Sequence, residues 1–414
     1  MDAFTSNLLG WLCVGVTTLF GVSVFYTAKR SPAEKANLLL WSLLPTLLGL
    51  LCVAMLGTGG GLVVFCTMCL ISVYLGNRAL LPVGDKAVLI TEMQVWTPLT
   101  AHTSEEALLG LYLIQTGSDT GIGHALAKHL DDLGFVVIAG VLNKDGPGAE
   151  ELRRTCSQRL SLLQLDVTNA TQVKEAYLKV SAKVQDTGLW GVVNNAGILG
   201  LPADGELIPM STYRQCMEVN FFGAVELSKT FLPLLRKSRG RLVNVSSMAG
   251  GIPLPRYAAY GASKAALSMF SGVMRQELSK WGVKVAAIHP SGFRTGIQGT
   301  ADLWAKQEKE LIENLPADTR QDYGEDYLLE LKSYLLHMPL YCDANLSPVL
   351  GAILHALLAK RPQGLYTPGK GAYMPLCIFC YFPLWVYDFF ISKMLSPKSV
   401  PRVLRTSEAA SKDL

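Results

Sequence analysis

The stretch LYLIQTGSDTGIG, residues 111–123, joins an apolar strand candidate to a loop of three glycines that runs into a helix. The strand is expected at 111–115 and the helix at 124–133. Gly117 permits a tight turn, Gly121 lets the backbone approach a pyrophosphate, and Gly123 allows the helix to pack closely. Because backbone amides at the start of a helix attract phosphate, this order indicates a dinucleotide-binding loop.

Strand and helix candidates alternate after this loop. Further strands are expected at 135–142, 160–165, 189–193, 241–245 and 283–288. Helices are expected at 171–184, 212–235, 302–315, 326–337 and 348–358. Such alternation predicts an α/β fold, a Rossmann-type doubly wound parallel sheet covered on both faces. Ligands of these sheets bind beyond the carboxyl ends of the strands.

A second strand candidate, residues 86–91, competes for the first place in the sheet. Residues 92–115 separate it from the glycine loop and form an atypical insertion, such as a gene-model or splicing artefact would produce. Because the loop must follow its strand directly, 111–115 is favoured for that place over 86–91.

Tyr260 and Lys264 stand four residues apart on an expected helix, so both side chains leave the same face. Ser247 lies upstream, at the end of an expected buried strand. A free phenol has a pKa of about 10, and a nearby ammonium group lowers that pKa. A phenol so adjusted can exchange a proton with a carbinol or carbonyl oxygen. Ser247 can hold the same oxygen by a hydrogen bond.

Two further patterns are interpreted as having no catalytic role. Tyr366 and Lys370 repeat the four-residue spacing, but Pro368 lies between them, so they do not share a helix face. The cysteine pairs within 66–69 and 377–380 lie in apolar runs without the four ligands that zinc needs. We expect no metal site.

The strand ends supply the remaining candidates for cofactor binding. Asn143 follows the second strand, where such folds place an acid for the adenosine ribose. The glycine loop contains no lysine or arginine that would hold a 2′-phosphate, which favours NAD over NADP, although Lys144 is nearby. Ala196 and Gly197 are small, as suits a strand end beside a cofactor; the alternative is a plain turn.

Three apolar segments without charge open the chain, at 7–26, 37–56 and 62–75. The first two are long enough to span a bilayer, which takes about 20 residues. We expect residues 1–80 to form a membrane anchor of about three transmembrane helices. A cleaved signal peptide is the alternative for the first segment, but that segment lacks a basic start. By the positive-inside rule, the basic loop Lys29–Lys35 is expected in the cytosol, and three spans then put everything after Arg78 on the same side.

The rest of the chain divides into a catalytic domain, 81–370, and a carboxyl-terminal part, 371–414. Residues 373–395 are rich in aromatic side chains and are expected to lie in the membrane interface. A fourth span is the alternative, which two prolines and Asp388 oppose. The formal charge of +4 and the scattered basic residues indicate no nucleic-acid partner. The cysteines of a cytosolic domain should stay reduced.

Taken together, these motifs resemble the short-chain dehydrogenase/reductase family. The resemblance covers residues 86 to about 359, less the insertion, and depends on Thr116-Gly-x-x-x-Gly-Ile-Gly, Asn194-Asn-Ala-Gly, Asn220, Ser247 and Tyr260-x-x-x-Lys264. It implies that Tyr260 is the general acid/base and that Lys264 binds the nicotinamide ribose. It also implies that Asn220 supports a proton-relay water and that Asp166 contacts adenine. One departure is Ser291, which is expected to strain the turn after Pro290.

The residues that the resemblance and the strand ends assign to function form two sets. The catalytic set is Asn220, Ser247, Tyr260 and Lys264, of which Ser247 and Tyr260 also bind the substrate. The cofactor set is Gly117, Ser118, Asp119, Gly121, Ile122, Gly123, Asn143, Asp166, Val167, Asn194, Ala196, Gly197, Tyr260, Lys264, Pro290 and Thr295.

Segments 140–156, 216–223 and 366–373 further resemble the membrane-bound hydroxysteroid dehydrogenases of that family. This implies an enzyme of the endoplasmic reticulum membrane, with its catalytic domain in the cytosol, that uses NAD to oxidise a steroid 17β-hydroxyl. Estradiol and testosterone would be substrates, with a 20α-hydroxyprogestin as a further one. An 11β-hydroxysteroid, retinol or lipid-alcohol dehydrogenase is an alternative, and so is a non-catalytic membrane-bound NAD-binding scaffold. By family analogy, a homodimer would form through the helices around Asn220 and Tyr260.

Overall fold

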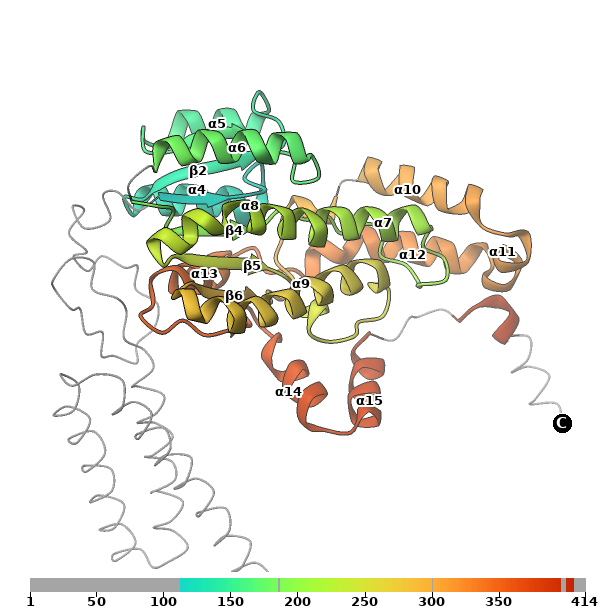
Figure 1. Ribbon diagram of the computed structural model, residues 1–414. Helices are drawn as coiled ribbons and strands as arrows, with labels where there is room; N and C mark the ends of the chain where they lie inside the picture. The colour runs from blue at the N-terminus through green and yellow to red at the C-terminus, as the bar shows by residue number, and fades with distance from the viewer. Residues whose placement is uncertain (1–111, 185–186, 300, 396–399, 406–414) are drawn as a thin grey trace, which may run out of the picture. The chain divides into compact units, whose positions relative to one another are not determined.

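The computed structural model describes residues 112–184, 187–299, 301–395 and 400–405 (Figure 1). The chain divides into two compact units, the first of which comprises Met1–Pro82, Ala87–Met93 and Ala359–Arg361. The second unit, Val83–Lys86, Gln94–Leu358 and Pro362–Leu414, contains nearly all described residues. The expected amino-terminal spans and the strand candidate 86–91 lie outside the described residues.

Within the described ranges, one parallel sheet of seven strands forms, in the order β3-β2-β1-β4-β5-β6-β7. The strands are β1 (Tyr112–Gln115), β2 (Val136–Val141), β3 (Ser161–Gln164), β4 (Gly191–Asn194), β5 (Arg241–Val245), β6 (Lys284–Ile288) and β7 (Leu365–Tyr366). The strand order reverses between β1 and β4, and ligands of such sheets bind at this switch point. The expected parallel sheet is therefore confirmed.

Successive side chains of the strands enter two separate buried layers. Leu113 of β1 packs in one layer and Ile114 in the other, and Val193 and Val192 of β4 do the same. The first layer is covered by α4 (Gly121–Asp132), α5 (Pro147–Thr155) and α13 (Ser347–Leu358). The second is covered by α6 (Ala170–Lys183), α8 (Ala224–Ser238) and α9 (Ala258–Glu277). Burial on both faces explains why apolar residues dominate the central strands.

The first strand is Tyr112–Gln115, which confirms the candidate that runs directly into the glycine loop. It pairs with β2 on one side and β4 on the other, so it lies at the centre of the sheet. The last four residues of the expected insertion 92–115 are thus a core strand. Residues 92–111 lie outside the described part of the chain.

The single helix expected at 212–235 is wrong. Three helical segments replace it: α7 (Met210–Met217), a π-helical turn η2 (Glu218–Gly223) and α8. Asn220 lies in the π turn, and its buried side chain bonds both the N–H and the carbonyl of Ile198. A π turn widens the helix by one residue per turn, a geometry that side-chain periodicity does not reveal.

Helices α10 (Ala301–Asn314), α11 (Ala317–Tyr323) and α12 (Glu325–His337) form a cap beyond β4 and α9. Trp304, Leu311 and Leu328 of the cap are buried in a third apolar cluster. The same cluster includes Leu201 from the segment after β4, and Tyr260 packs against it. The sequence predicted α10 and α12 but not the short α11.

Residues 373–395 form two short helices, α14 (Tyr373–Tyr381) and α15 (Leu384–Leu395), with a break at Pro383. Proline cannot continue the first helix, because it lacks an N–H and its ring clashes with the preceding turn. Of the helices in the described ranges, none combines the length and the apolar character needed to cross a bilayer. Residues 373–395 thus form two separate helices and not one continuous helix.

Candidate active site

Lys264 is held from both ends by strand β5. Its Nζ donates a hydrogen bond to the Val245 carbonyl at 2.9 Å, and its own carbonyl accepts one from Ser246 Oγ at 2.8 Å. The side chain is buried, and its Nζ lies 5.9 Å from the centre of the Tyr260 ring. The shared helix face thus brings the two groups together as expected.

Burial dominates the electrostatics of this pair. It raises the pKa of Tyr260 to about 12, against the Ser247 hydroxyl, whose hydrogen bond lowers that pKa. It also lowers the pKa of Lys264 to about 8, against the Cys216 thiol, which raises that pKa. The pKa of Tyr260 in the protein by itself is therefore raised overall, where the sequence predicted a lowered one, because burying the phenolate costs more than the neighbouring groups return.

Ser247 lies directly after β5 and begins a short 3₁₀ turn, η3 (Met248–Gly250). Its Oγ accepts a hydrogen bond from the Ala249 N–H at 3.2 Å and also bonds the Tyr260 phenol. The hydroxyl is thus fixed by the backbone on one side and by the phenol on the other. A hydroxyl and a phenol that meet in this way can bind one substrate oxygen together.

The π turn aims Asn220 at the segment after β4. Its Nδ2 donates to the Ile198 carbonyl and to Ser263 Oγ, each at 2.9 Å, and its Oδ1 accepts from the Ile198 N–H. A side chain at Gly197 would come within 3.1 Å of both Asn220 Oδ1 and Lys264 Nζ. Asn220 therefore positions the β4 end against Lys264, and its own side chain is fully hydrogen-bonded.

The glycine loop has the shape that a pyrophosphate requires. Gly117 and Gly121 have φ angles of +67° and +63°, which side-chain-bearing residues rarely adopt. A side chain at Gly121 would come within 2.9 Å of Thr295, and one at Gly117 within 2.9 Å of Ala196. Glycine is therefore required at both positions by the backbone conformation and by close packing, and a tight glycine turn before a helix is the arrangement that binds a pyrophosphate in dinucleotide folds.

Thr116 and Asn195 hold this loop in place and are absent from the predicted set. Thr116 Oγ1 accepts hydrogen bonds from the N–H groups of Asn195 and Ala196, both at 3.0 Å. Asn195 Nδ2 donates to the carbonyls of Thr116 and Gly117, both at 3.1 Å. Both residues stand inside motifs quoted above, so their polar side chains were a usable signal.

Asp119 reaches from the glycine loop to the end of β2. Its Oδ2 accepts the Leu142 N–H at 2.8 Å, and its Oδ1 accepts the Asn143 N–H at 3.3 Å. Asn143 itself is exposed, and its Oδ1 accepts the Asp145 N–H. The carboxylate at the end of β2 therefore comes from Asp119 and not from the residue that follows the strand.

Several predicted cofactor residues have structural partners instead. Asn194 Nδ2 donates to Asn244 Oδ1 at 2.7 Å and to Ser228 Oγ at 2.8 Å, within the layer under α8. Ser118 is buried, and its Oγ accepts from Gln115 Nε2. The side chains of Asn194 and Ser118 are therefore occupied within the fold, which leaves their backbone atoms for contact with a cofactor.

The other predicted cofactor residues lie at the carboxyl edge of the sheet. Asp166, after β3, accepts hydrogen bonds from the N–H and the hydroxyl of Thr168. Val167 packs against Gly223 so closely that a side chain at Gly223 would come within 2.7 Å of it. Ile122 and Gly123 are in α4, with Ile122 packed on the core. Pro290 accepts the Met248 N–H at 3.0 Å.

Ser291 does not strain its turn. Among the described residues, only Arg239 and Arg256 combine a side chain with a positive φ, so the expected strain is wrong. The Ser291 N–H donates to the Pro368 carbonyl at 3.0 Å, which ties the turn to the segment after β7. The second Tyr-x-x-x-Lys pair starts at Tyr366, whose hydroxyl is occupied by His355 and the Gln363 N–H.

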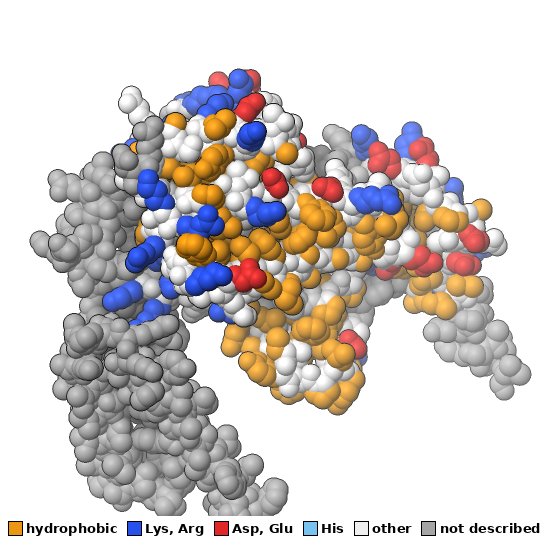
Figure 2. Space-filling view, in the orientation of Figure 1, with side chains coloured by type: hydrophobic (Ala, Val, Ile, Leu, Met, Phe, Trp, Pro, Cys, Tyr) orange, Lys and Arg blue, Asp and Glu red, His pale blue; other side chains and the backbone are white. Residues whose placement is uncertain are grey.

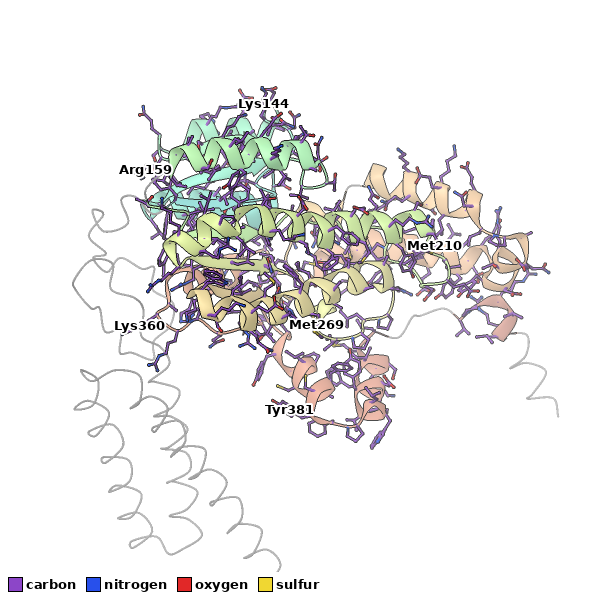
Figure 3. All side chains as sticks on the ribbon, in the orientation of Figure 1. Lys144, Arg159, Met210, Met269, Lys360 and Tyr381 are labelled. Atoms are coloured by element: carbon purple, nitrogen blue, oxygen red, sulfur yellow. The ribbon has the colours of Figure 1, made fainter. Side chains whose placement is uncertain are left out.

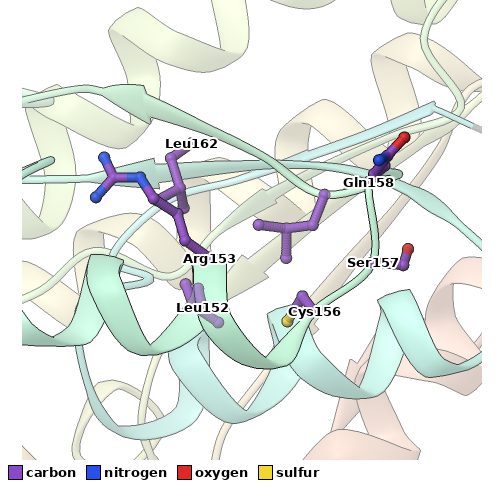
Figure 4. Close-up of a pocket in the computed structure, with 7 residues that line it drawn as sticks. Leu152, Arg153, Cys156, Ser157, Gln158 and Leu162 are labelled. Atoms are coloured by element: carbon purple, nitrogen blue, oxygen red, sulfur yellow. The ribbon is translucent and has the colours of Figure 1, made fainter.

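Helix α5 and strand β3 border a surface pocket of about 310 Å³, lined in part by Arg153, Cys156 and Leu162 (Figure 4). Burial raises the pKa of the Cys156 thiol, which keeps it in its less reactive form. Arg153 donates a hydrogen bond to the Lys144 carbonyl. The pocket thus lies where α5 ends and β3 begins, at the amino edge of the sheet, away from the carboxyl ends of the strands.

Residues 112–306 match the short chain dehydrogenase family. A 17-beta-hydroxysteroid dehydrogenase type 2 from Homo sapiens is 51% identical over 409 residues, which are 98% of this chain and 98% of that protein. The chain belongs to the short chain dehydrogenase family. It is therefore an oxidoreductase, and the scaffold alternative, which required a distorted glycine loop, loses its basis.

Three further proteins are similar to this chain, one by sequence and two by structure. An 11-beta-hydroxysteroid dehydrogenase type 2 from Oryctolagus cuniculus is 46% identical over 71% of this chain and 72% of its own. A solved short chain dehydrogenase from Burkholderia cenocepacia, in complex with NADP, covers 70% of this chain and 99% of its own at 22% identity and a TM-score of 0.51. A 3-ketoacyl-(acyl-carrier-protein) reductase from Brucella melitensis, complexed with NADH, has a TM-score of 0.51 at 19% identity over 64% of this chain and 100% of its own. These two structures support the fold alone.

The buried lysine predicts a pH dependence of stability. Its pKa falls from 10.5 to about 8 on folding, so between these pH values the unfolded chain binds a proton that the folded chain has released. The free energy of unfolding should then rise with pH, by up to about 1.4 kcal/mol per pH unit. Urea unfolding of the full chain at pH 8, 9 and 10 measures this rise. Lys264→Met should lack it, and parallel profiles for the two proteins would contradict the assignment.

Proposed function

We propose that this chain oxidises the 17β-hydroxyl of steroids with NAD, taking estradiol to estrone and testosterone to androstenedione. A 20α-hydroxyprogestin is a further substrate. The observation that carries the proposal is the similarity to the human 17β enzyme, which runs through 98% of both chains. The Ser247, Tyr260 and Lys264 arrangement supports it, because these groups suit proton transfer at an alcohol oxygen.

The proposed reaction uses these three side chains on one alcohol. Ser247 and Tyr260 bind the substrate hydroxyl, and the Tyr260 phenolate accepts its proton as the carbon releases a hydride. The nicotinamide, when bound, accepts that hydride and adds a positive charge that favours the phenolate. Lys264 binds the nicotinamide ribose and keeps a second positive charge within 5.9 Å of the phenol ring. The products are a ketone, the reduced cofactor and a protonated Tyr260.

The preference for NAD is argued from Asp119. Its carboxylate lies on the backbone of Leu142 and Asn143, where the adenosine ribose of a dinucleotide fold binds. A carboxylate there can accept hydrogen bonds from ribose hydroxyls and repels a 2′-phosphate. Lys144, Arg153 and Arg154 are close, but Asp145 and Glu150 line the same surface as the two arginines and offset their charge.

Replacing Tyr260 with phenylalanine should lower kcat for estradiol by about 10²- to 10⁴-fold, because the proton acceptor is lost. Direct binding of NAD to the full chain should change little, since the ring and Lys264 remain. Tyr213→Phe, which removes an exposed phenol bonded to the Gly205 carbonyl, is the control. An active Tyr260→Phe enzyme would show that another group takes the proton.

Replacing Asp119 with asparagine should strengthen NADP binding by roughly tenfold or more, because one negative charge near the 2′-phosphate is removed. The dissociation constants of NAD and NADP, measured by calorimetry on the full chain, test this without turnover. Asp145→Asn removes a charge from the next loop and serves as the control. If both variants shift NADP binding equally, the selectivity does not reside in Asp119.

An 11β-hydroxysteroid is the second candidate substrate, favoured by the 46% identity to the rabbit 11β enzyme. Retinol and other lipid alcohols share the same catalytic requirement. The three side chains recognise an alcohol and not the ring system that carries it. Product analysis with estradiol, an 11β-hydroxysteroid and retinol, each with NAD and with NADP, separates these candidates.

We also propose that the enzyme resides in the endoplasmic reticulum membrane with its catalytic domain in the cytosol. The uncharged segments 7–26 and 37–56 and the basic loop between them support this orientation. Protease added outside sealed microsomes should then digest the catalytic domain. Protection of that domain until detergent is added would reverse the orientation.

We propose a homodimer that forms through the outer surface of the π turn and α9. Met269 and Val273 of α9 and Phe222 of the π turn are exposed apolar side chains, and Met269 is labelled in Figure 3. Pairing two copies would bury them. The mass of the detergent-solubilised chain, before and after Met269→Glu, tests the pairing.

A further inference from the structure

Helices α14 and α15 expose a continuous apolar surface. Tyr373, Met374, Tyr381, Phe382, Leu384, Trp385, Phe389 and Met394 are each between 49% and 83% exposed. Figure 2 shows hydrophobic side chains over both helices, and Figure 3 labels Tyr381 at the turn between them. Asp388 and Lys393 are the only charged residues between 371 and 395. Apolar surface on this scale marks an interaction site.

The inner side of this hairpin packs beside the catalytic serine. Tyr387 and Ile391 of α15 form a buried cluster with Ile252, and the Tyr387 hydroxyl donates to the Pro253 carbonyl. Met248 and Leu254 join the same cluster. The segment 248–254 begins directly after Ser247, so the hairpin packs on the chain that leads away from this serine.

The chemistry of the exposed side favours lipid over protein. Protein interfaces carry a polar rim around their apolar centre, whereas the tip from Tyr381 to Trp385 has no charged residue. Tyrosine and tryptophan are enriched where a bilayer meets water. The Nζ of Lys393 lies 5.8 Å from the centre of the Phe389 ring. A lysine side chain can lay its apolar stem along such a surface while its amine reaches the lipid headgroups.

The length of the helices decides how they would meet a bilayer. Helices of 9 and 12 residues extend about 14 and 18 Å, well short of the roughly 30 Å hydrocarbon core. They can therefore enter one leaflet but not cross it. The same chain carries two uncharged segments long enough to span a bilayer, at 7–26 and 37–56, so lipid is a partner that its own sequence favours.

We propose that the α14–α15 hairpin is a lipid-docking surface that inserts its aromatic tip into one leaflet. Through the Tyr387 and Ile391 contacts it places segment 248–254, and with it Ser247, next to the bilayer. A lipophilic alcohol dissolved in the membrane then reaches the site along this segment. This last step depends on the proposed function, whereas the docking itself does not.

Fluorescence quenching by lipids brominated on their acyl chains tests the docking. The full chain is reconstituted in phosphatidylcholine vesicles with and without bromine, and the Trp385 contribution is obtained by subtracting the spectrum of Trp385→Phe. Trp281, 51% exposed at the end of α9, provides the control through Trp281→Phe. Trp385 should lose most of its emission to bromine, and Trp281 should lose little. This measurement requires no turnover.

Two results would overturn the docking proposal. Equal quenching of Trp385 and Trp281 would show that the tip does not enter lipid. A blue-shifted but unquenched Trp385 emission would show that protein covers the tip, either a second copy or another segment of this chain.

A double charge variant tests the consequence for the substrate. Trp385→Glu with Phe389→Glu should raise the apparent KM for vesicle-dissolved estradiol roughly tenfold, because two apolar contacts with lipid are lost. The KM for NAD should stay unchanged. Leu178→Glu with Met210→Glu adds the same charge at exposed positions on α6 and α7 and should leave both values unchanged. Suppose that Trp385 of the unsubstituted chain is quenched but the steroid KM of the first variant is unchanged. The docking would then stand, and the access route would be removed.

Discussion

The hydrogen bond from Lys264 to the Val245 carbonyl is the contact on which the site depends. It links helix α9 to the carboxyl end of β5, and Ser246 secures the same lysine through its backbone. The amine is buried, so moving it from this position would break its hydrogen bond without a replacement from water. Tyr260, one turn earlier, is placed by the same helix. Every group that meets a substrate oxygen is therefore positioned relative to one strand end.

The segment after β4 completes the arrangement from the other side. Asn220 binds both backbone groups of Ile198, and the π turn supplies the extra residue that lets it reach them. π turns inside helices are frequent at functional sites, because they redirect one side chain without breaking the helix. Asn195 and Thr116 perform the corresponding task for the glycine loop. The switch point of the sheet is thus held by side-chain amides and hydroxyls, which carry no net charge beside the cofactor.

The family and the chemistry of the site are separate conclusions with separate bases. Similarity along the whole chain places the protein among the dehydrogenases, whereas the geometry accounts for what its side chains can do. Because burial raises the pKa of Tyr260, proton acceptance in the proposed reaction depends on positive charge brought to the site. Lys264 and an oxidised nicotinamide are the two sources that the family chemistry provides.

The sequence by itself determined the sheet, the glycine loop and the Ser247, Tyr260 and Lys264 group, because periodicity and helical spacing act over a few residues. It also favoured Tyr112–Gln115 as the first strand, since the loop had to follow directly. Only the tertiary structure decided that Asp119 supplies the carboxylate at the end of β2, that Asn194 faces the core, and that Asn220 lies in a π turn. These three depend on contacts between residues more than twenty positions apart, which local pattern does not encode. The pKa of Tyr260 belongs with them, because burial is a property of the packed molecule.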